Sequence, residues 1–353
     1  MKRLLKSILP GKAVEKVQRT TQVIDYYLIR IFVKSKWLSG LYYSLFNQGL
    51  NREAQSVLAG RIKHDTDLAA GSQFKLRRNI HRLEKGLIMK PRRAVFAEAY
   101  IVETVKSYAL CVSENGYCEA ERKWAQDVLL QYFEVVEKTP TVNEASRQFF
   151  DVHESCDVSE HQFIPYSSDK RPEITIKSES LYELFRARRS VRWFEQRPVD
   201  MREIERAVEM AAQAPSACNR QPFHFYVINE PERAQRIASI PMGTKGFSQN
   251  VQSLVVLVGD LSAYPKERDR HVIYIDGGLV AMQFMLALET LQLSSCPINW
   301  PDMEAYEKRM EKELALKAFQ RPIMLMAIGY ADKSGDIPYS QKKSIRSLIK
   351  EVK

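Results

Sequence analysis

The sequence predicts an α+β fold, with a sheet in the C-terminal half and a mainly α-helical N-terminal region before it. Apolar residues in the N-terminal half recur at helical spacing. Between 155 and 177, Ser and Pro residues break this periodicity. We therefore expect a helical basic N-terminal region over 1–170 and a second domain over 171–353. Strand-like apolar runs of the second domain lie at 223–229, 253–259 and 322–330.

Helical patterns flank these strand-like runs. Residues 181–188 and 200–213 are predicted helices, and Asp200 with Glu203 forms a capping-box arrangement at the start of the second. The segment 275–293 is apolar nearly all round, which predicts a helix buried on all sides. In a domain of this size, such a helix is expected at a subunit interface.

The composition is that of a folded globular protein. Of 353 residues, 45% are hydrophobic and 27% are charged, which excludes disordered and fibrous classes. No uncharged apolar run reaches about eighteen residues, so no membrane span is expected. Residues 1–16 have too short an apolar core for a signal peptide.

Cysteine and histidine usage indicates neither a disulfide framework nor a metal site. The five cysteines form no CxxC pair, which fits reduced thiols and a cytoplasmic location. His153, Cys156 and His161 lie close together, but their spacing matches no standard metal-binding motif. We therefore expect no metal.

Positive charge is concentrated near the N-terminus. Residues 1–100 carry 20 Lys and Arg against 7 Asp and Glu, whereas the remainder carries 33 against 36. This asymmetry indicates an anionic partner of residues 1–100, a peripheral membrane surface or an acidic protein, without specific nucleic-acid binding. A solvated, helix-rich surface explains it equally well.

Two N-terminal segments have distinct patterns. Residues 16–48 hold a dense aromatic and aliphatic cluster, which fits an interfacial helix, although packing against the other N-terminal helices is favoured. Residues 74–91 predict a helix that ends at Gly86. Its His81, Glu84 and Lys85 suggest acid–base chemistry, but basic residues near a helix C-terminus also complement the helix dipole, so no reaction is assigned.

The loop 215–222, PSACNRQP, lies between a helical run and a strand-like run. Pro215 ends the helix, and the small residues after it leave the backbone accessible to a ligand. Asn219 and Gln221 supply amide donors and acceptors that suit the polar edge of a ring with carbonyls and nitrogens.

A basic cluster precedes this loop by about thirty residues. Arg188 and Arg189 offer planar charged forks to a phosphate, and Ser190 adds a short neutral hydrogen bond. Arginine pairs alone are ordinary surface charge, but the cluster and the loop in this order predict a bound flavin phosphate and ring.

Residues from about 178 to 353 resemble the FMN-dependent nitroreductase family. The resemblance covers about half of the chain and implies a mixed sheet flanked by helices, a homodimer, and a flavin bound between the subunits. HRLEKGL (81–87) is similar to an N-terminal extension of some nitroreductase-like proteins of polysaccharide gene clusters. The matching segments are RRSVRWF (188–194), APSACNRQPFHF (214–225), IDGGLVAMQFMLALETLQL (275–293) and RPIMLMAIGYAD (321–332).

The resemblance also implies which residues hold FMN. The arginine and serine cluster binds the phosphate, the 215–222 loop lies near the ring, and the segment 294–300 passes along one face. IPYSQKKSIRSLI (337–349) stands where the family has a basic segment that reaches the phosphate. Ala217 and Phe223 depart from the family's usual Ser and Trp. The implied residues are Arg188, Arg189, Ser190, Arg192, Pro215, Ser216, Ala217, Asn219, Gln221, Ser295, Cys296, Pro297, Ser340, Lys342 and Lys343.

We therefore expect a cytoplasmic, homodimeric oxidoreductase. It would transfer hydride from NADH or NADPH through bound flavin to an electron-poor small molecule, of nitro, quinone or enone type, by a ping-pong mechanism. The flavin carries the chemistry, so no catalytic side chain is expected. Two alternatives stay open: a specialised flavin-dependent dehydrogenation in a biosynthetic pathway, and a flavin-fold scaffold whose N-terminal region docks to a membrane or protein partner.

Overall fold

The computed structural model describes residues 11–70, 73–113, 118–152 and 162–352. The chain forms two compact units. The first comprises residues 1–55 and 302–304, and the second comprises 56–301 and 305–353. The predicted domain boundary near residue 170 stays a prediction. The cluster His153, Cys156 and His161 lies outside the described residues.

The first unit is a pair of helices, α2 (Gly11–Phe32) and α3 (Lys36–Leu45), followed by the start of α4 (Asn51–Ala70). Ser35 caps α3 by accepting a hydrogen bond from the amide of Leu38 at 3.2 Å. The two helices meet through the rings of Phe32, Tyr42 and Phe46, whose centroids lie 5.5 to 6.2 Å apart.

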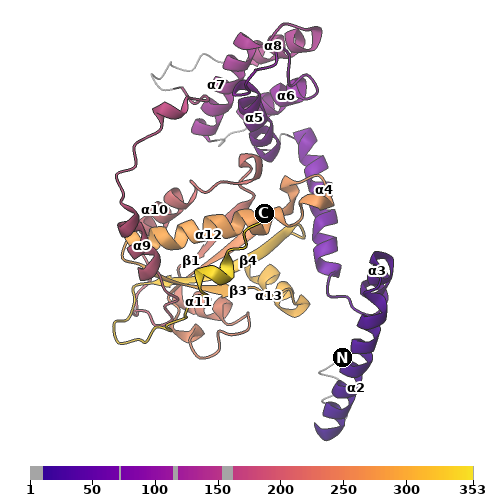
Figure 1. The fold of residues 1–353 in the computed structure, drawn as a ribbon, viewed down its shortest axis with the longest axis vertical. Helices are drawn as coiled ribbons and strands as arrows, with labels where there is room; N and C mark the ends of the chain where they lie inside the picture. The colour runs from indigo at the N-terminus through magenta and orange to yellow at the C-terminus, as the bar shows by residue number, and fades with distance from the viewer. Residues whose placement is uncertain (1–10, 71–72, 114–117, 153–161, 353) are drawn as a thin grey trace. The chain divides into compact units, whose positions relative to one another are not determined.

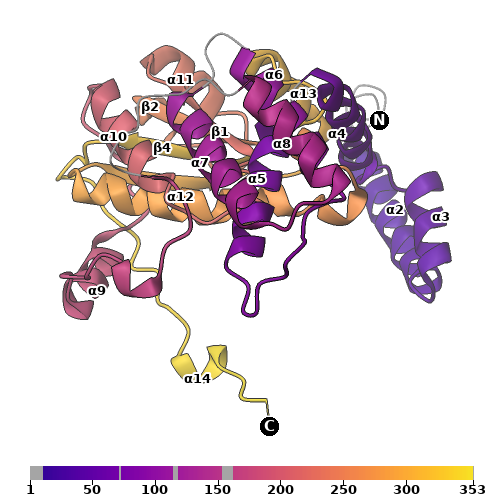
Figure 2. The same ribbon diagram turned by 90° about the horizontal axis from the view of Figure 1, so that it is seen from above.

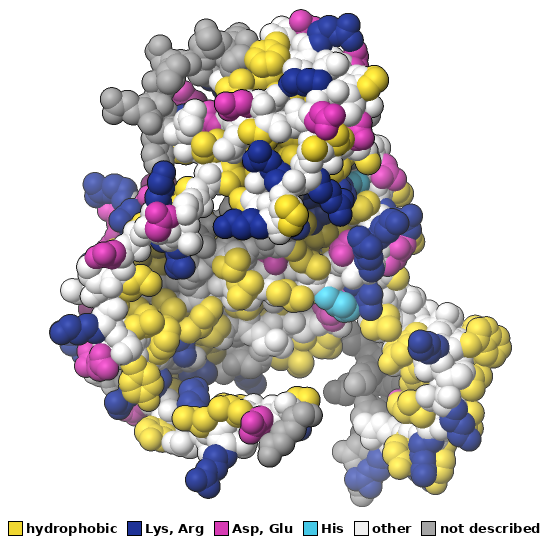
Figure 3. All heavy atoms as spheres, turned by 45° about the horizontal axis from the view of Figure 1, so that its top comes forward, with side chains coloured by type: hydrophobic (Ala, Val, Ile, Leu, Met, Phe, Trp, Pro, Cys, Tyr) yellow, Lys and Arg dark blue, Asp and Glu magenta, His cyan; other side chains and the backbone are white. Residues whose placement is uncertain are grey.

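Most of the N-terminal apolar cluster is exposed. Ile24, Tyr27 and Trp37 are each more than half exposed, and Trp37 reaches 74%. Figure 3 shows hydrophobic side chains interspersed with Lys and Arg on this unit. Within the first unit, α2 and α3 bury little beyond the ring of Tyr42 between them, so packing against the other N-terminal helices stays a prediction.

Four helices of the second unit share one hydrophobic core. Leu76, Ile80 and Leu83 of α5 recur at helical spacing and are fully buried in it. Gly86 does not end α5, because the helix continues to Leu87 and the ring of Phe96 packs against the glycine, where a Cβ would clash. The four helices are α5 (Gln73–Leu87), α6 (Ile101–Ser113), α7 (Glu119–Val135) and α8 (Pro140–Val152).

The C-terminal half contains a four-stranded sheet in the order β1-β2-β4-β3, with every neighbouring pair antiparallel (Figure 1). The α+β class and the three predicted strands are confirmed. The second strand in the chain is buried along its whole length, as expected for the centre of a sheet covered on both faces. The strands are β1 (Phe223–Ile228), β2 (Ser253–Asp260), β3 (Ser294–Asn299) and β4 (Gln320–Gly329).

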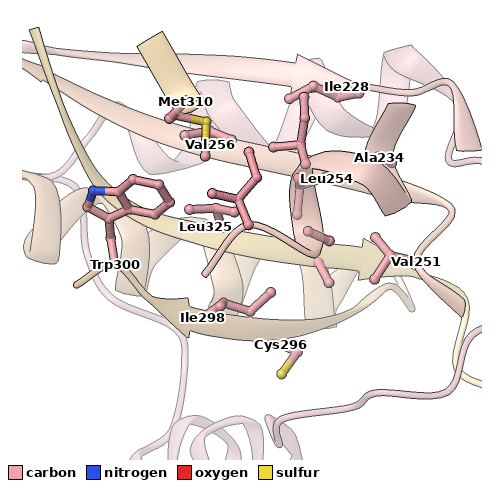
Figure 4. Close-up of a cluster of buried hydrophobic side chains, with 14 of the residues drawn as sticks. Ile228, Ala234, Val251, Leu254, Val256, Cys296, Ile298, Trp300, Met310 and Leu325 are labelled. Atoms are coloured by element: carbon pink, nitrogen blue, oxygen red, sulfur yellow. The ribbon is translucent and has the colours of Figure 1, made fainter. Parts of the chain in front are cut away.

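Helices cover both faces of the sheet (Figures 1 and 2). On one face, α10 (Met201–Ala211) and α12 (Val272–Thr290) pack against Val255 and Leu257 of β2. On the other face, α11 (Pro231–Ala238) and α13 (Glu304–Leu314) pack against the alternate residues, Leu254 and Val256 (Figure 4). This alternation is the two-residue period of a strand.

Helix α12 is not buried on all sides. Phe284 and Leu288 lie in the core, but Ile275, Leu279 and Met282 are 60%, 44% and 40% exposed and form an apolar stripe at helical spacing. The segment Glu267–Thr290 has the length and apolar composition of a membrane span, with half of that window buried inside the protein. Packing of α12 against β2, β3 and β4 accounts for this composition, because a helix in a protein core can be as long and as apolar as a membrane span.

The remaining elements are short. Helices α9 (Ser178–Ala187) and α14 (Ile345–Leu348) contain no buried residue. Val57 of α4 joins Leu261, Tyr264 and Ile273 in a small cluster beyond the end of β2. The 3-10 helices are η1 (Ser168–Lys170), η2 (Ala217–Asn219), η3 (Ser248–Asn250), η4 (Leu261–Ala263) and η5 (Glu267–Asp269).

Candidate functional site

The arginine cluster lies alongside the start of β3. The amide of Val191 donates to the main-chain oxygen of Ser295 at 3.0 Å, and Ser190 forms a parallel β-bridge with Ser295. Helix α9 ends just before Arg188, so the chain is extended where it joins the bridge. The structure therefore brings together two predicted groups, residues 188–192 and 295–297. That 294–299 forms a strand was not predicted.

Two polar atoms at this junction are buried without a hydrogen-bond partner among the described residues. They are Nε of Arg188 and Oγ of Ser295, and Ser295 is fully buried. Leaving such donors unpaired is costly, and a ligand that accepts hydrogen bonds would satisfy both. A cationic fork beside a hydroxyl fits the phosphate of FMN.

Glu289, near the C-terminal end of α12, faces the same cluster. Burial raises the pKa of Glu289 to about 7, against the charge of Arg188 and a hydrogen bond from the backbone of Arg189. A carboxyl that is largely neutral below this pH leaves the charge of Arg188 available to an anion. Sequence reasoning missed Glu289, although it is one of only two acids, with Asp276, in the apolar run 275–293.

Cys296 follows Ser295 on β3 and is buried. Burial raises the pKa of its thiol, while the charges of Arg192 and Arg188 act in the opposite direction. Its side chain belongs to the hydrophobic cluster shown in Figure 4. A protonated, buried thiol is a poor nucleophile, so in this structure Cys296 contributes packing to the core.

The 215–222 loop has an unusual backbone. Cys218, Asn219 and Gln221 have positive φ angles of 54°, 52° and 51°, a conformation that costs non-glycine residues on the order of 1 kcal/mol or more. Ser216 holds the turn, because its Oγ accepts a hydrogen bond from the amide of Gln221 at 3.1 Å. The Gln221 side chain donates to Oδ1 of Asn219 at 3.3 Å, so the two predicted ring-facing amides are joined.

Contacts from two other elements hold this loop. Asp276, near the start of α12, accepts from the amide of Ala217 at 3.0 Å and from the hydroxyl of Tyr264 at 3.4 Å. From α5, Nε of Arg77 donates to the main-chain oxygen of Asn219 at 2.8 Å. Neither Asp276 nor Arg77 was predicted, because each contacts a loop more than fifty residues away in the sequence.

The loop and the arginine cluster lie at opposite ends of α12. Asp276 contacts the loop, whereas Glu289 contacts the backbone of Arg189. Thirteen residues of helix separate these two acids, which corresponds to about 20 Å. The structure therefore does not bring the two predicted halves of the flavin site together within one chain.

The basic C-terminal segment is also apart from the arginine cluster. Ser340, Lys342 and Lys343 are exposed. Among the described residues, no hydrogen bond or ion pair joins them to residues 188–192. Ser340 has a positive φ of 50°.

Of the three polar residues His81, Glu84 and Lys85 on α5, Glu84 lines a cavity. His81 Nδ1 is 3.4 Å from Oε2 of Glu84, and the indole of Trp124 donates to Oε1 of Glu84 at 2.9 Å. The cavity, of about 730 Å³, is lined by Glu84, Trp124, Phe163, Tyr166 and Lys170 among others. Lys85 is exposed on the far side of the helix from Leu83. Within the described ranges, no group of His, Cys, Asp and Glu could hold a metal ion.

Comparisons with known proteins identify the C-terminal half. The model of the Nitroreductase family matches residues 185–252 and 242–330. The putative NAD(P)H nitroreductase YdgI of Bacillus subtilis strain 168 is 27% identical over 202 residues, 46% of this chain and 94% of that protein. Iodotyrosine deiodinase 1 of Sus scrofa is 30% identical over 227 residues, 55% of this chain and 76% of that protein.

A solved structure, the nitroreductase family protein of Streptococcus pneumoniae TIGR4, superposes with a TM-score of 0.42 at 22% identity, covering 49% of this chain and 100% of that one. The family match coincides with the segments that carry the arginine cluster, the 215–222 loop and the sheet. This chain belongs to the nitroreductase family.

Proposed function

We propose that this protein is an FMN-dependent oxidoreductase that uses NADH or NADPH to reduce an electron-poor small molecule. The observation that carries the proposal is a pair of buried donors, Nε of Arg188 and Oγ of Ser295, that have no partner in the described part of this nitroreductase-family chain. Bound FMN would supply the hydride chemistry. NAD(P)H as the reductant follows the name of the Bacillus subtilis relative.

The protein's own residues would bind and orient this cofactor. Arg188, Arg189 and Ser190 hold the phosphate, with Ser295 as a further donor. The amides of Asn219 and Gln221 position the ring. No side chain acts as a nucleophile. One pocket used in turn by the nicotinamide and the acceptor gives ping-pong kinetics.

The proposal includes a homodimer in which the 215–222 loop of one subunit meets the arginine cluster of the other. The two halves of the site are about 20 Å apart along α12 within one chain, so a second copy is needed to join them. The exposed stripe Ile275, Leu279 and Met282 on α12 supplies an apolar face for that contact. Lys342 and Lys343 would reach the phosphate in the assembled dimer.

The test is cofactor content and reduction. Protein purified with FMN in excess should be yellow, and its absorbance near 450 nm should fall when NADH or NADPH is added without oxygen. Charge reversal at Arg188 and Arg189 should abolish FMN binding, whereas Arg206→Glu, on the exposed surface of α10, should not. Colourless protein whose absorbance does not change when NADH or NADPH is added would contradict the proposal.

The acceptor panel should contain a nitroaromatic, a quinone, an enone and iodotyrosine. Iodotyrosine belongs in it because the relative from Sus scrofa is an iodotyrosine deiodinase. Rapid reoxidation of the reduced protein by one class assigns the acceptor type. Reoxidation by none of them favours the alternative, a specialised dehydrogenation in a biosynthetic pathway.

We further propose that the first unit binds an anionic membrane surface from the cytoplasmic side. Its exposed Ile24, Tyr27 and Trp37 are accompanied by Lys and Arg residues, the composition of an interfacial helix pair. Tyr and Trp favour the headgroup level because their rings are amphipathic. Asp25, one of the few acids here, accepts a hydrogen bond from the Tyr42 hydroxyl.

Co-sedimentation of the full chain with vesicles tests this second proposal. We expect binding to vesicles that contain phosphatidylglycerol, weaker binding to phosphatidylcholine alone, and loss at high salt. Ile24→Glu with Trp37→Glu should reduce binding about tenfold. Ile174→Glu, at a 79% exposed position of the second unit, is the matched control. Equal sedimentation of all variants would contradict the proposal.

A further inference from the structure

Helix α5 places a row of arginines beside the 215–222 loop. Arg77 touches the loop directly through the main-chain oxygen of Asn219, and its guanidinium also pairs with Glu121. Arg78 is the next residue, and Arg82 lies one turn further along the same side of α5. The Nε and Nη1 atoms of Arg77 are thus engaged by protein groups, so ligand binding is assigned to the other two arginines.

The loop contributes a third arginine, Arg220. Its side chain is 8% exposed, and its guanidinium lies 4.9 Å from the ring centroid of Tyr264. Nη1 makes a long hydrogen bond of 3.4 Å to the main-chain oxygen of Ala217, but the buried Nε has no partner. The guanidinium carbon of Arg82 likewise lies over an aromatic ring, 3.6 Å from the ring centroid of Tyr100. Aromatic faces thus hold two of these cations without neutralising them.

The positive charges of Arg220 and Arg82 act on Arg78. Burial lowers the pKa of Arg78, and the charges of Arg220 and Arg82 lower it further. Among the described residues, none of the three forms an ion pair. Glu103 pairs with Lys75. Asp276, which accepts from Ala217 and Tyr264, is an acidic neighbour of Arg220 without forming an ion pair with it.

A cluster of mutually repelling, partly buried cations is costly unless an anion joins it. The planar guanidinium group can donate two parallel hydrogen bonds to the oxygens of one carboxylate or phosphate group. The cluster borders the loop whose Asn219 and Gln221 would face the flavin ring, so the anion it binds lies next to the reacting molecules.

We propose that Arg78, Arg82 and Arg220 form an anion-binding subsite that selects an acceptor carrying a carboxylate or a phosphate group. The inference rests on the proposed function, because the acceptor is reduced at the flavin. It gives α5, and with it the N-terminal extension, a part in choosing the substrate. The same chemistry would recognise the phosphate groups of NADPH, so the experiment separates the two sources.

The first arm uses two nitro compounds of similar size, para-nitrobenzoate and neutral para-nitrobenzyl alcohol. In the double variant Arg78→Gln with Arg82→Gln, the ratio of kcat/KM for the anion to kcat/KM for the alcohol should fall about tenfold or more. Arg78→Lys with Arg82→Lys should recover part of the preference. Lys106→Gln, an exposed cation on α6, is the matched control and should leave the ratio unchanged.

The second arm compares anaerobic flavin reduction by NADPH and NADH in the same variants. A fall in the NADPH to NADH ratio with an unchanged nitro-compound ratio would assign the subsite to the reductant and overturn the proposal.

The third arm needs no activity. Calorimetric titration with inorganic pyrophosphate should show binding that the double variant weakens about tenfold and Arg188→Gln leaves in place. Equal binding by wild type and double variant, or none by either, overturns the proposal. If no flavin is bound but this arm succeeds, the subsite stands and the proposed function fails. Thermal unfolding of each variant excludes misfolding as the cause.

Discussion

Nε of Arg77 donates to the main-chain oxygen of Asn219 at 2.8 Å, across 142 positions of sequence. This contact joins α5, in the N-terminal half, to a turn in which three non-glycine residues have positive φ. Such a turn persists only when its surroundings hold it. The hydrogen bond from Arg77 to Glu121 comes from a different nitrogen, Nη1, so Glu121 can be changed without removing the Asn219 contact.

Arg77→Ala should weaken FMN binding about tenfold, because the loop loses a charge-assisted hydrogen bond and relaxes. Titration followed by flavin fluorescence measures the dissociation constant. Glu121→Gln is the control, since it removes the ion pair and keeps the Asn219 contact. Equal weakening by both variants would show that the ion pair, and not the loop contact, matters.

Ser295 and Ser253 are both fully buried, but among the described residues only the hydroxyl of Ser253 has hydrogen-bond partners. Ser253 Oγ donates to the side chain of Asn229 and accepts from the amide of Val199 at 3.0 Å. Ser253→Ala should therefore lower the free energy of unfolding by about 1–2 kcal/mol, whereas Ser295→Ala should change it by less than about 0.5 kcal/mol.

For FMN binding, the relative effects of the two variants should be reversed. Ser295→Ala should weaken FMN binding several-fold, whereas Ser253→Ala should leave it intact. Urea unfolding of the flavin-free protein and FMN titration give the two readouts. A strongly destabilised Ser295→Ala would mean that its hydroxyl has a partner within the protein.

Glu289 should make stability depend on pH. Its pKa is raised from an ordinary value of 4.5 to about 7 in the folded protein, so the native state retains a proton that the unfolded chain has lost. The stabilisation that protonated Glu289 adds to the free energy of unfolding is complete below about pH 4.5 and is lost as the pH rises through about 7. Glu289→Gln removes this dependence.

We measure the free energy of unfolding in urea at about pH 5.5 and about pH 8. Over this range it should fall on the order of 1 kcal/mol more in wild type than in Glu289→Gln, a small value because Glu289 is only partly buried. FMN affinity should also fall over this range in wild type, because the ionised carboxylate competes with the phosphate for Arg188. Glu205→Gln, exposed on α10, is the control. Parallel pH profiles for wild type and Glu289→Gln would refute the assignment.

The sequence was sufficient where the signal is local. Short apolar runs located β1, β2 and β4, and the arginine and PSxxN motifs indicated the two halves of the candidate site. Residues 294–299 were not predicted as a strand, because Ser, Cys, Pro and Asn are weak strand formers and only pairing with β4 makes this segment regular.

Long-range contacts explain what the sequence did not reveal. Arg77, Asp276 and Glu289 gain their significance from partners that only the fold brings near. The pattern of 275–293 indicated burial on all sides, because Ile275, Leu279 and Met282 are as apolar as the residues that pack on the sheet. Composition cannot distinguish a side chain in a core from one reserved for a second subunit.

That stripe carries the last prediction. Leu279→Glu should convert the protein to a monomer, because it places a charge in the centre of the apolar face of α12. Light scattering after size-exclusion chromatography should show the change in mass. FMN should be lost with the dimer, because in the proposed homodimer the two halves of its site come from different subunits. Met242→Glu, at a 59% exposed position away from α12, should leave both mass and flavin content unchanged. A monomeric Leu279→Glu variant that still holds FMN would show that one chain is enough to form the site.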